Sequence, residues 1–125
     1  MPTTGFYEWK QGGVKTPYYI DRKDHQLFAF AGLYDVWQGE DGRTIPSFTI
    51  ITVPANDLVG RIHERMPAIL TPAEEGPWLE PGPLNDDDLK SILASHPTPE
   101  LEAYPVSRQV NSPAIEGPEL IQRAA

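Results

Sequence analysis

The chain has 125 residues, a formal net charge of −8 and no cysteine. A chain of this length forms one domain at most, the absence of cysteine excludes disulfides and thiolate chemistry, and no apolar run approaches the roughly 20 residues that a membrane-spanning helix needs. The acidic balance argues against indiscriminate nucleic-acid binding, which depends on neutralising phosphates. Because no apolar leader opens the chain, we expect a cytoplasmic protein with no membrane partner.

The acidic residues are concentrated in the second part of the chain. Residues 1–70 carry eight acidic and seven basic side chains, whereas residues 71–125 carry ten acidic and three basic ones. The first part is therefore close to neutral, and a local cationic groove there is compatible with the overall charge. The basic residues that would form it are Lys10, Lys15, Arg61 and Arg65.

Three strands are predicted in the first third of the chain. Residues 5–10 are rich in aromatic side chains, and residues 16–20 form a second run with Pro17 near its start, where a missing N–H matters least. After a polar turn at residues 21–24, the apolar residues between 26 and 37 predict a strand that is kinked or bulged near Gly32.

A hairpin and a buried strand follow. The run Gly39–Gly42 is typical of a hairpin turn. Residues 47–53 contain Phe48, Ile50, Ile51 and Val53 with β-branched threonines between them and are predicted to form a buried strand. Four large aromatic residues of these strands are assigned to the core: Phe28, Tyr34, Trp37 and Phe48.

The middle of the chain predicts a short helix, a strand and a loop. Asn56 or Asp57 can cap a helix that runs through Ile62, although a role for Asn56 in a functional site is left open. Residues 66–70 predict another strand. Residues 71–84 contain four of the prolines and are expected to form a proline-rich loop, held to the body by Trp78 and including at most a helical turn.

The C-terminal third predicts one clear helix. Asn85 is placed to cap a helix over residues 84–95, since three aspartates fill its first turn, where the helix dipole favours negative charge. Pro97 would stop it. Residues 104–110 are predicted to form a last strand and residues 112–125 a flexible tail. The order of elements indicates an α+β fold, a mostly antiparallel sheet or partly open barrel with two or three short helices.

Glu8 and His63 are the candidate catalytic residues. Glu8 lies among Phe6, Tyr7 and Trp9, which can desolvate a carboxyl group and favour its proton-donating form, and histidine titrates near neutral pH. The alternative is that Glu8 is an exposed residue of an edge strand and that His63 binds the carbonyls at a helix end. The other histidines, His25 and His96, are assigned to turns or helix ends. No spacing of ligands predicts a metal site, and no cofactor is implied.

Several ordered blocks carry a resemblance to a known family. The blocks are GFYEWK, KTPYYI, FAFAGLYDVW, SFTIITVPAN, IHERMPAIL and YPVSRQVN. Together they resemble the C-terminal part of the SRAP domain, the SOS response-associated peptidase family, whose members protect abasic sites in single-stranded DNA. The resemblance identifies residues 1–125 as a partial SRAP domain and implies a DNA-damage function in the bacterial cytoplasm or nucleoid.

The resemblance assigns roles to particular residues. It implies that Glu8 and His63 lie in the active site, where the glutamate helps to open the sugar to its aldehyde form and the histidine exchanges a proton as a Schiff base forms or reverses. The DNA-contacting positions of the family correspond to Trp9, Lys10, Thr52 and Arg65. The alternative is that Trp9 belongs to the core and that Arg65 neutralises an acidic neighbour such as Glu64.

The chain departs from the family in its nucleophile. The family begins with a cysteine directly after the initiator methionine, and the amine and thiol of this cysteine condense with the abasic aldehyde. This chain begins Met1-Pro2-Thr3 and contains no cysteine. The resemblance implies peptidase- or lyase-like chemistry for the family, and we expect no crosslinking by this chain alone.

Two other functions remain compatible with these residues. The chain could be a non-catalytic module, or half of a split protein that needs self-association or a chain supplying the N-terminal part. It could also be a small β-rich ligand-binding domain in which Glu8 and His63 are structural. A cleft shared by Glu8 and His63 would favour the SRAP-like function over these two alternatives. We expect such a cleft, with Thr52 and Arg65 at its rim and Trp9 as a wall.

Overall fold

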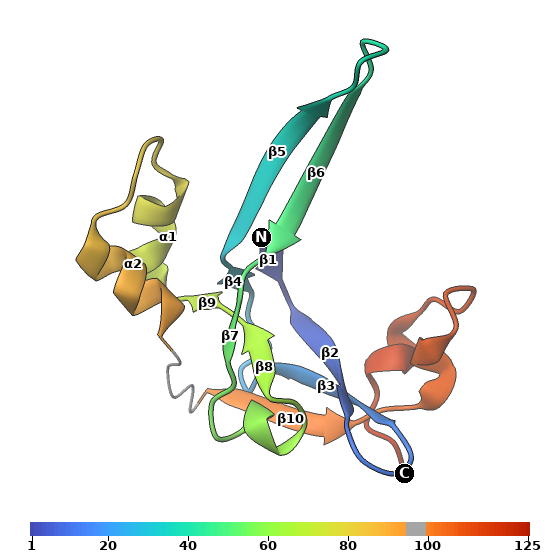
Figure 1. Ribbon diagram of the computed structural model, residues 1–125. Helices are drawn as coiled ribbons and strands as arrows, with labels where there is room; N and C mark the ends of the chain where they lie inside the picture. The colour runs from blue at the N-terminus through green and yellow to red at the C-terminus, as the bar shows by residue number, and fades with distance from the viewer. Residues whose placement is uncertain (95–99) are drawn as a thin grey trace.

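The computed structural model describes residues 1–94 and 100–125, and it has an α+β architecture in which antiparallel strands predominate (Figure 1). The N-terminal half contains β1 (Pro2–Thr3), β2 (Gly5–Lys10), β3 (Thr16–Arg22), β4 (Phe28–Phe30), β5 (Gly32–Gln38), β6 (Thr44–Ile50) and β7 (Thr52–Pro54). The remainder contains the 3-10 helix η1 (Val59–Arg61), β8 (Arg65–Pro67), β9 (Ile69–Leu70), α1 (Pro72–Leu79), α2 (Asp86–Leu93), β10 (Leu101–Pro105) and the 3-10 helices η2 (Arg108–Asn111) and η3 (Pro118–Ile121). The predicted fold class is confirmed, and the described strands form no closed barrel.

The best-packed part of the molecule is the sheet with strand order β10-β3-β2. Side chains of successive strand residues point to opposite faces, and both faces of β3 are covered. Ile20 is fully buried and belongs to the main apolar cluster, while Tyr19 is buried in a second cluster with Tyr104 and Val106. The strands predicted at residues 5–10 and 16–20 are confirmed, although β3 continues through Arg22, where a polar turn was expected.

Three further predicted strands are interrupted at a common point. The breaks fall at Ala31, Ile51 and Ala68, between β4 and β5, β6 and β7, and β8 and β9. Their backbones are joined by hydrogen bonds from Ala31 N–H to Ala68 O (2.8 Å), Ile51 N–H to Ala31 O (3.0 Å) and Ala68 N–H to Ile51 O (2.8 Å). The kink predicted near Gly32 is thus a junction where several short sheets meet around buried Ala31 and Ala68.

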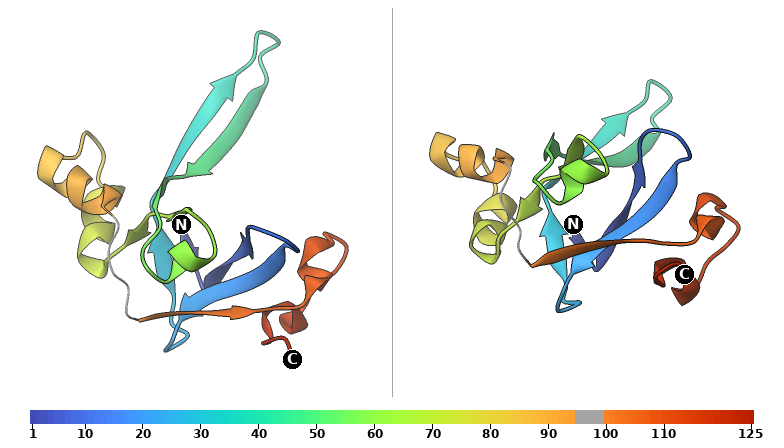
Figure 2. Two further views of the ribbon diagram at one scale, coloured as in Figure 1. Left: turned by 60° about the horizontal axis from the view of Figure 1, so that its bottom comes forward. Right: turned by 90° about the horizontal axis from the view of Figure 1, so that it is seen from below.

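The hairpin of β5 and β6 projects away from this junction, as both views in Figure 2 show. The turn predicted at Gly39–Gly42 is confirmed, with Gly42 at φ 78°, a left-handed conformation that favours glycine. The assignment of three aromatics to the core is wrong: Tyr34 is 85 %, Phe48 66 % and Trp37 60 % exposed, whereas Phe28 is buried as predicted. The expected burial of residues 47–53 is also wrong for β6, in which every residue except Ile50 is exposed, and it holds for Val53.

The two α-helices form an arm at one side of the sheets (Figure 1), and α2 contributes buried Ile92 to the main apolar cluster. The stretch expected to be a proline-rich loop over residues 71–84 instead contains α1, since Pro72 occupies the first turn and the Thr71 N–H donates to Glu74 Oε2 at 2.8 Å. Helix α2 begins after Asn85, whose Oδ1 accepts the Asp88 N–H as predicted. The helix ends at Leu93, because Ala94 already has an extended backbone, so the predicted span over residues 84–95 is too long at both ends. Ser95, His96 and Pro97 lie outside the described residues.

The C-terminal region folds back along β10. The strand predicted at residues 104–110 lies earlier, at β10, and residues 108–111 form η2 instead. The segment expected to be a flexible tail makes defined contacts: Tyr104 donates to Ile121 O (2.8 Å), and the Ala124 N–H donates to Pro105 O (2.9 Å). Within the described residues, no helix is long and apolar enough to cross a membrane.

Candidate functional site

The Glu8 side chain projects from the face of β2 that meets the main apolar cluster. Phe6 packs against that cluster and Tyr7 against the second one, so the alternation of the strand places Glu8 on the side of Phe6. Glu8 is half-buried, and its Oε1 accepts the Trp9 N–H at 3.1 Å. The carboxyl group is therefore held close to the strand and retains access to solvent.

His63 lies two residues after η1, and the side chain of Asn56 stabilises the start of that turn. The buried Asn56 Oδ1 accepts the Val59 N–H at 3.0 Å, and the His63 N–H donates to Val59 O at 2.9 Å. The prediction that Asn56 or Asp57 begins a short helix is thus confirmed for Asn56. Because this cap lies in the core, it fixes the turn that carries His63.

The imidazole of His63 is oriented by the residue that starts β8. Its Nδ1 lies 3.0 Å from Arg65 N and 3.2 Å from Arg65 O. In the tautomer that accepts the Arg65 N–H at Nδ1, the ring carries its proton on Nε2, whereas in the other tautomer Nδ1 donates to Arg65 O. In both cases Nδ1 is engaged by the backbone of Arg65. Nε2 is then the nitrogen at which the ring would exchange a proton with a substrate.

A backbone contact connects the elements of Glu8 and His63. The Gln11 N–H, just past β2, donates to Ile62 O at 3.4 Å, one residue before His63. Ile62 and Val59 also belong to the cluster against which Phe6 packs. The Glu8 face of β2 therefore adjoins the η1 turn, and the two lie side by side in Figure 1.

Thr52 and Arg65 lie together on the paired strands β7 and β8. The Arg65 guanidinium donates to Thr52 O (2.7 Å from Nη2) and to Thr52 Oγ1 (3.1 Å from Nη2 and 3.3 Å from Nε). Both side chains are exposed. The contacts of Arg65 are thus with Thr52 and not with Glu64, and the pair forms one polar edge next to His63.

Trp9 and Lys10 lie on opposite faces of β2. Lys10 is exposed at the strand end on the Glu8 side. The Trp9 indole Nε1 donates to Asn111 Oδ1 at 2.7 Å and its ring lies 6.4 Å from that of Tyr7, on the side of the second cluster. The placement of Trp9 as a wall beside Glu8 is therefore wrong, because adjacent strand residues point in opposite directions.

The hydrogen bond between Trp9 and Asn111 is a contact that the sequence did not predict. Asn111 lies 102 positions from Trp9, at the end of η2, and the strand predicted over residues 104–110 gave no reason to bring it there. The only signal was its presence at the end of the YPVSRQVN block.

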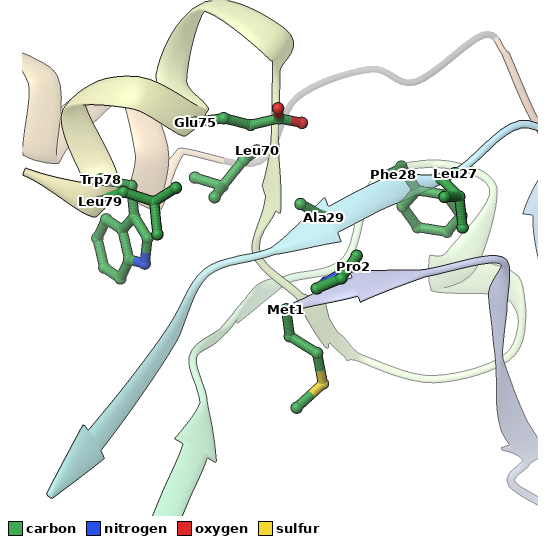
Figure 3. Close-up of a pocket in the computed structure, with 9 residues that line it drawn as sticks. All are labelled: Met1, Pro2, Leu27, Phe28, Ala29, Leu70, Glu75, Trp78 and Leu79. Atoms are coloured by element: carbon green, nitrogen blue, oxygen red, sulfur yellow. The ribbon is translucent and has the colours of Figure 1, made fainter.

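A separate apolar pocket of about 390 Å³ lies between the N-terminus and α1 (Figure 3). Trp78 and Leu79 of α1 and Leu70 of β9 line it opposite Ala29 of β4 and the N-terminal residues. Glu75 is the one carboxylate among its lining residues. The lining suits apolar packing, and it includes neither Glu8 nor His63.

Comparison with known proteins identifies the family. A model of the family described as SOS response associated peptidase (SRAP) matches residues 1–113. The abasic site processing protein YoqW of Bacillus subtilis is 45% identical over 124 residues, covering 98% of this chain and 55% of its own. The abasic site processing protein HMCES of Xenopus tropicalis is 35% identical over 135 residues, covering 92% of this chain and 40% of its own.

Solved structures support the same relationship. A crystal structure of a protein from Bacteroides thetaiotaomicron superimposes with a TM-score of 0.88 at 38% identity, covering 99% of this chain and 55% of that one. The chain thus spans about half the length of the relatives it matches. On the strength of the match over residues 1–113, the chain belongs to the SRAP family.

Proposed function

We propose that this chain contributes half of a site that processes abasic positions in single-stranded DNA, with Glu8 and His63 as its acid–base residues. Relatives are named abasic site processing proteins. The observation that supports the proposal is the hydrogen bond between Gln11 N–H and Ile62 O, since it joins the end of the strand that carries Glu8 to the residue before His63. A substrate atom or a water between them could contact both side chains.

The two side chains suit different proton transfers. The Glu8 carboxyl group can protonate the ring oxygen of an abasic sugar and help to open it to the aldehyde. His63, with its Nδ1 engaged by Arg65, can exchange a proton through Nε2 as a Schiff base forms or reverses. Each step needs the substrate within hydrogen-bond reach of both residues.

Lys10, Thr52 and Arg65 are the proposed contacts to the DNA backbone. A guanidinium has five N–H donors, so Arg65 can hold Thr52 and still donate to a phosphate. Trp9 can stack on a base only from the opposite face of β2, where it is bonded to Asn111. DNA binding that depends on the charges of Lys10 and Arg65 should weaken as salt is added.

The test supplies the missing nucleophile in trans. The part of YoqW that this chain does not cover is mixed with the chain and with single-stranded DNA carrying one abasic site. We expect a covalent product that survives heating in denaturant, and none with this chain alone, because it has no cysteine. A heat-stable adduct of the isolated chain would contradict the missing-nucleophile argument.

Matched variants separate chemistry from assembly. Glu8→Gln and His63→Ala should each slow product formation by about 10²-fold or more, in the range of general acid–base catalysis, while the two fragments still co-purify. Glu40→Gln, in the exposed hairpin turn, should react at the unmodified rate. Unchanged rates in both site variants would mean that Glu8 and His63 are structural.

A second candidate function is that of an assembly half, and the exposed β5–β6 hairpin favours it. In the observed register, Tyr34 pairs with Phe48 on one face and Trp37 pairs with Ile45 on the other, and all four side chains are at least half exposed. Large apolar patches of this kind mark interaction sites. The apolar pocket of Figure 3 adds a recess beside the base of the hairpin.

Sedimentation and an apolar dye test this second function. We expect the isolated chain to self-associate or to bind the dye, and the complementary fragment of YoqW to suppress both. A compact monomer that binds no dye would contradict the need for a covering partner, without bearing on the roles of Glu8 and His63.

A further inference from the structure

A cluster of three potential metal ligands lies on the outer side of the β10-β3-β2 sheet. Asp21 of β3, His25 of the following turn and Glu102 of β10 each offer one ligand atom, and these atoms lie within 4.8 Å of one another. Asp21 and Glu102 are direct partners in the antiparallel register. The fold therefore unites residues that are 81 positions apart, a distance at which no sequence spacing could indicate a site.

The cluster is electrostatically incomplete. Two carboxylates placed directly opposite each other across strands repel. Asp21 is only 4 % exposed, and while its Oδ2 meets His25 Nδ1 at 2.8 Å, its buried Oδ1 has no hydrogen-bond partner among the described residues. Buried polar atoms are normally paired, so Oδ1 points to a missing positive partner.

His25 is held in the cluster by an unusual backbone. Its φ is 56°, the one non-glycine residue with positive φ among those described, and its N–H donates to Arg22 O at 2.9 Å. A residue with a Cβ pays a conformational cost there that glycine would avoid. The imidazole is thereby fixed beside Asp21, whose hydrogen bond and charge raise the pKa of His25. A metal ion at this nitrogen has to displace the proton that Asp21 favours, so binding should be weaker at low pH.

The neighbouring arginines do not neutralise the negative charges of Asp21 and Glu102 at close range. Arg22 is engaged by Asp24, with Nη2 2.6 Å from Oδ2. Arg123 reaches Glu102 only at 3.8 Å and lies 4.5 Å above the Tyr104 ring. Neither guanidinium donates a hydrogen bond to Asp21 Oδ1.

We propose that Asp21, His25 and Glu102 bind a divalent transition-metal cation of the zinc type. One imidazole nitrogen and two carboxylate oxygens are ligands that zinc accepts, with water completing a tetrahedron. The charge of the ion cancels those of the two carboxylates and gives Asp21 Oδ1 its partner. Calcium and magnesium fit less well, because they require six or more oxygen ligands or an octahedron of oxygens and waters.

Bound metal would join β10 to β3 and to the turn after it. The expected consequence is a local gain in stability at this end of the sheet, because a ligand that binds only the folded state stabilises it. This role is independent of Glu8 and His63, which lie on other elements.

Metal titration of the full chain tests the proposal. With Co²⁺ as the probe, we expect one equivalent to produce the visible absorption of a four-coordinate site, and one equivalent of Zn²⁺ to abolish it by displacement. His25→Gly is the sharpest variant, since glycine accepts the positive φ while removing the imidazole. It should lose the absorption, as should Glu102→Gln.

The control is His63→Ala, which removes an imidazole outside the cluster and should bind one equivalent like the unmodified chain. Zn²⁺ should also raise the Tm of the unmodified chain and of His63→Ala but not of His25→Gly. If His25→Gly fails to fold, Glu102→Gln decides. No stoichiometric binding, or binding that persists in both cluster variants, overturns the proposal.

Discussion

The β10-β3-β2 sheet and the β5–β6 hairpin have similar kinds of sequence and opposite surroundings. Both are antiparallel and rich in aromatic and β-branched residues. In the sheet, Ile20 and Tyr19 are buried on opposite faces, whereas in the hairpin Tyr34 and Trp37 are exposed on opposite faces. An apolar pattern therefore indicates which side chains can be buried, and the elements that pack against the strand determine whether they are buried.

The largest contrast is expected from matched isoleucine truncations. Ile20→Ala leaves a cavity in the main cluster, where Ile20 is fully buried, and should lower the free energy of unfolding by about 2–5 kcal/mol. Ile45→Ala, in the half-exposed hairpin, should cost well under about 1 kcal/mol. Urea unfolding followed by far-UV circular dichroism measures both, and equal losses would mean that the hairpin is packed in solution.

Asparagine caps sharpen the comparison within the folded body. Asn56→Ala removes the buried cap of η1 and should cost about 1–2 kcal/mol, since the Val59 N–H loses its partner in the core. Asn85→Ala removes the exposed cap of α2, where water replaces the lost bond, and should cost about 0.5–1 kcal/mol. Thermal unfolding of the two variants gives the order, and a larger loss for Asn85→Ala would contradict it.

Trp78 connects the helical arm to the base of the hairpin. Its Nε1 donates to Gly32 O at 3.1 Å, at the first residue of β5. Trp78→Phe keeps most of the ring and removes this bond, so we expect a loss of about 1 kcal/mol. Amide exchange should also rise at the root of β5 but stay unchanged in β3, and equal changes in both would contradict a local role.

Polar substitution on the hairpin should barely change stability. Phe48→Lys, at a side chain that is 66 % exposed, should shift the free energy of unfolding by less than about 0.5 kcal/mol. It should nevertheless reduce self-association and dye binding, because it breaks the apolar patch shared with Tyr34. Lys15→Ala is the control. Unchanged self-association of Phe48→Lys would mean that the self-associating surface lies outside the hairpin.

Local patterns predicted much of the secondary structure. Strands β2 and β3 follow from alternating aromatic runs, the Gly39–Gly42 turn from its glycines, and α2 from Asn85 and the aspartates after it. The four prolines of residues 71–84 predict a loop with at most a helical turn, whereas the structure has the eight-residue helix α1 there. Pro72 at its start and the Thr71–Glu74 capping pattern were the signals that indicated a helix.

Long-range contacts were beyond local patterns. Nothing near Trp9 indicates that Asn111 accepts its indole N–H, and nothing near Asp21 indicates that Glu102 is its cross-strand partner. The candidate residues Thr52 and Arg65 do come together, because β7 and β8 pair, but that pairing depends on the intervening η1 turn. Sequence periodicity indicates which face of a helix or strand is buried, but it does not indicate which other element packs against that face.

The position of β2 at the end of its sheet has a consequence for how a polymer could run over this protein. Glu8 and Trp9 occupy the two sides of a strand whose outer edge pairs with no other strand of the described residues. A single-stranded chain that stacks one unit on Trp9 and presents the next to Glu8 must bend around that edge. Since a shift of one residue moves a strand side chain to the other face, such a path depends on the register that pairs Glu8 with Tyr18 and Trp9 with Pro17.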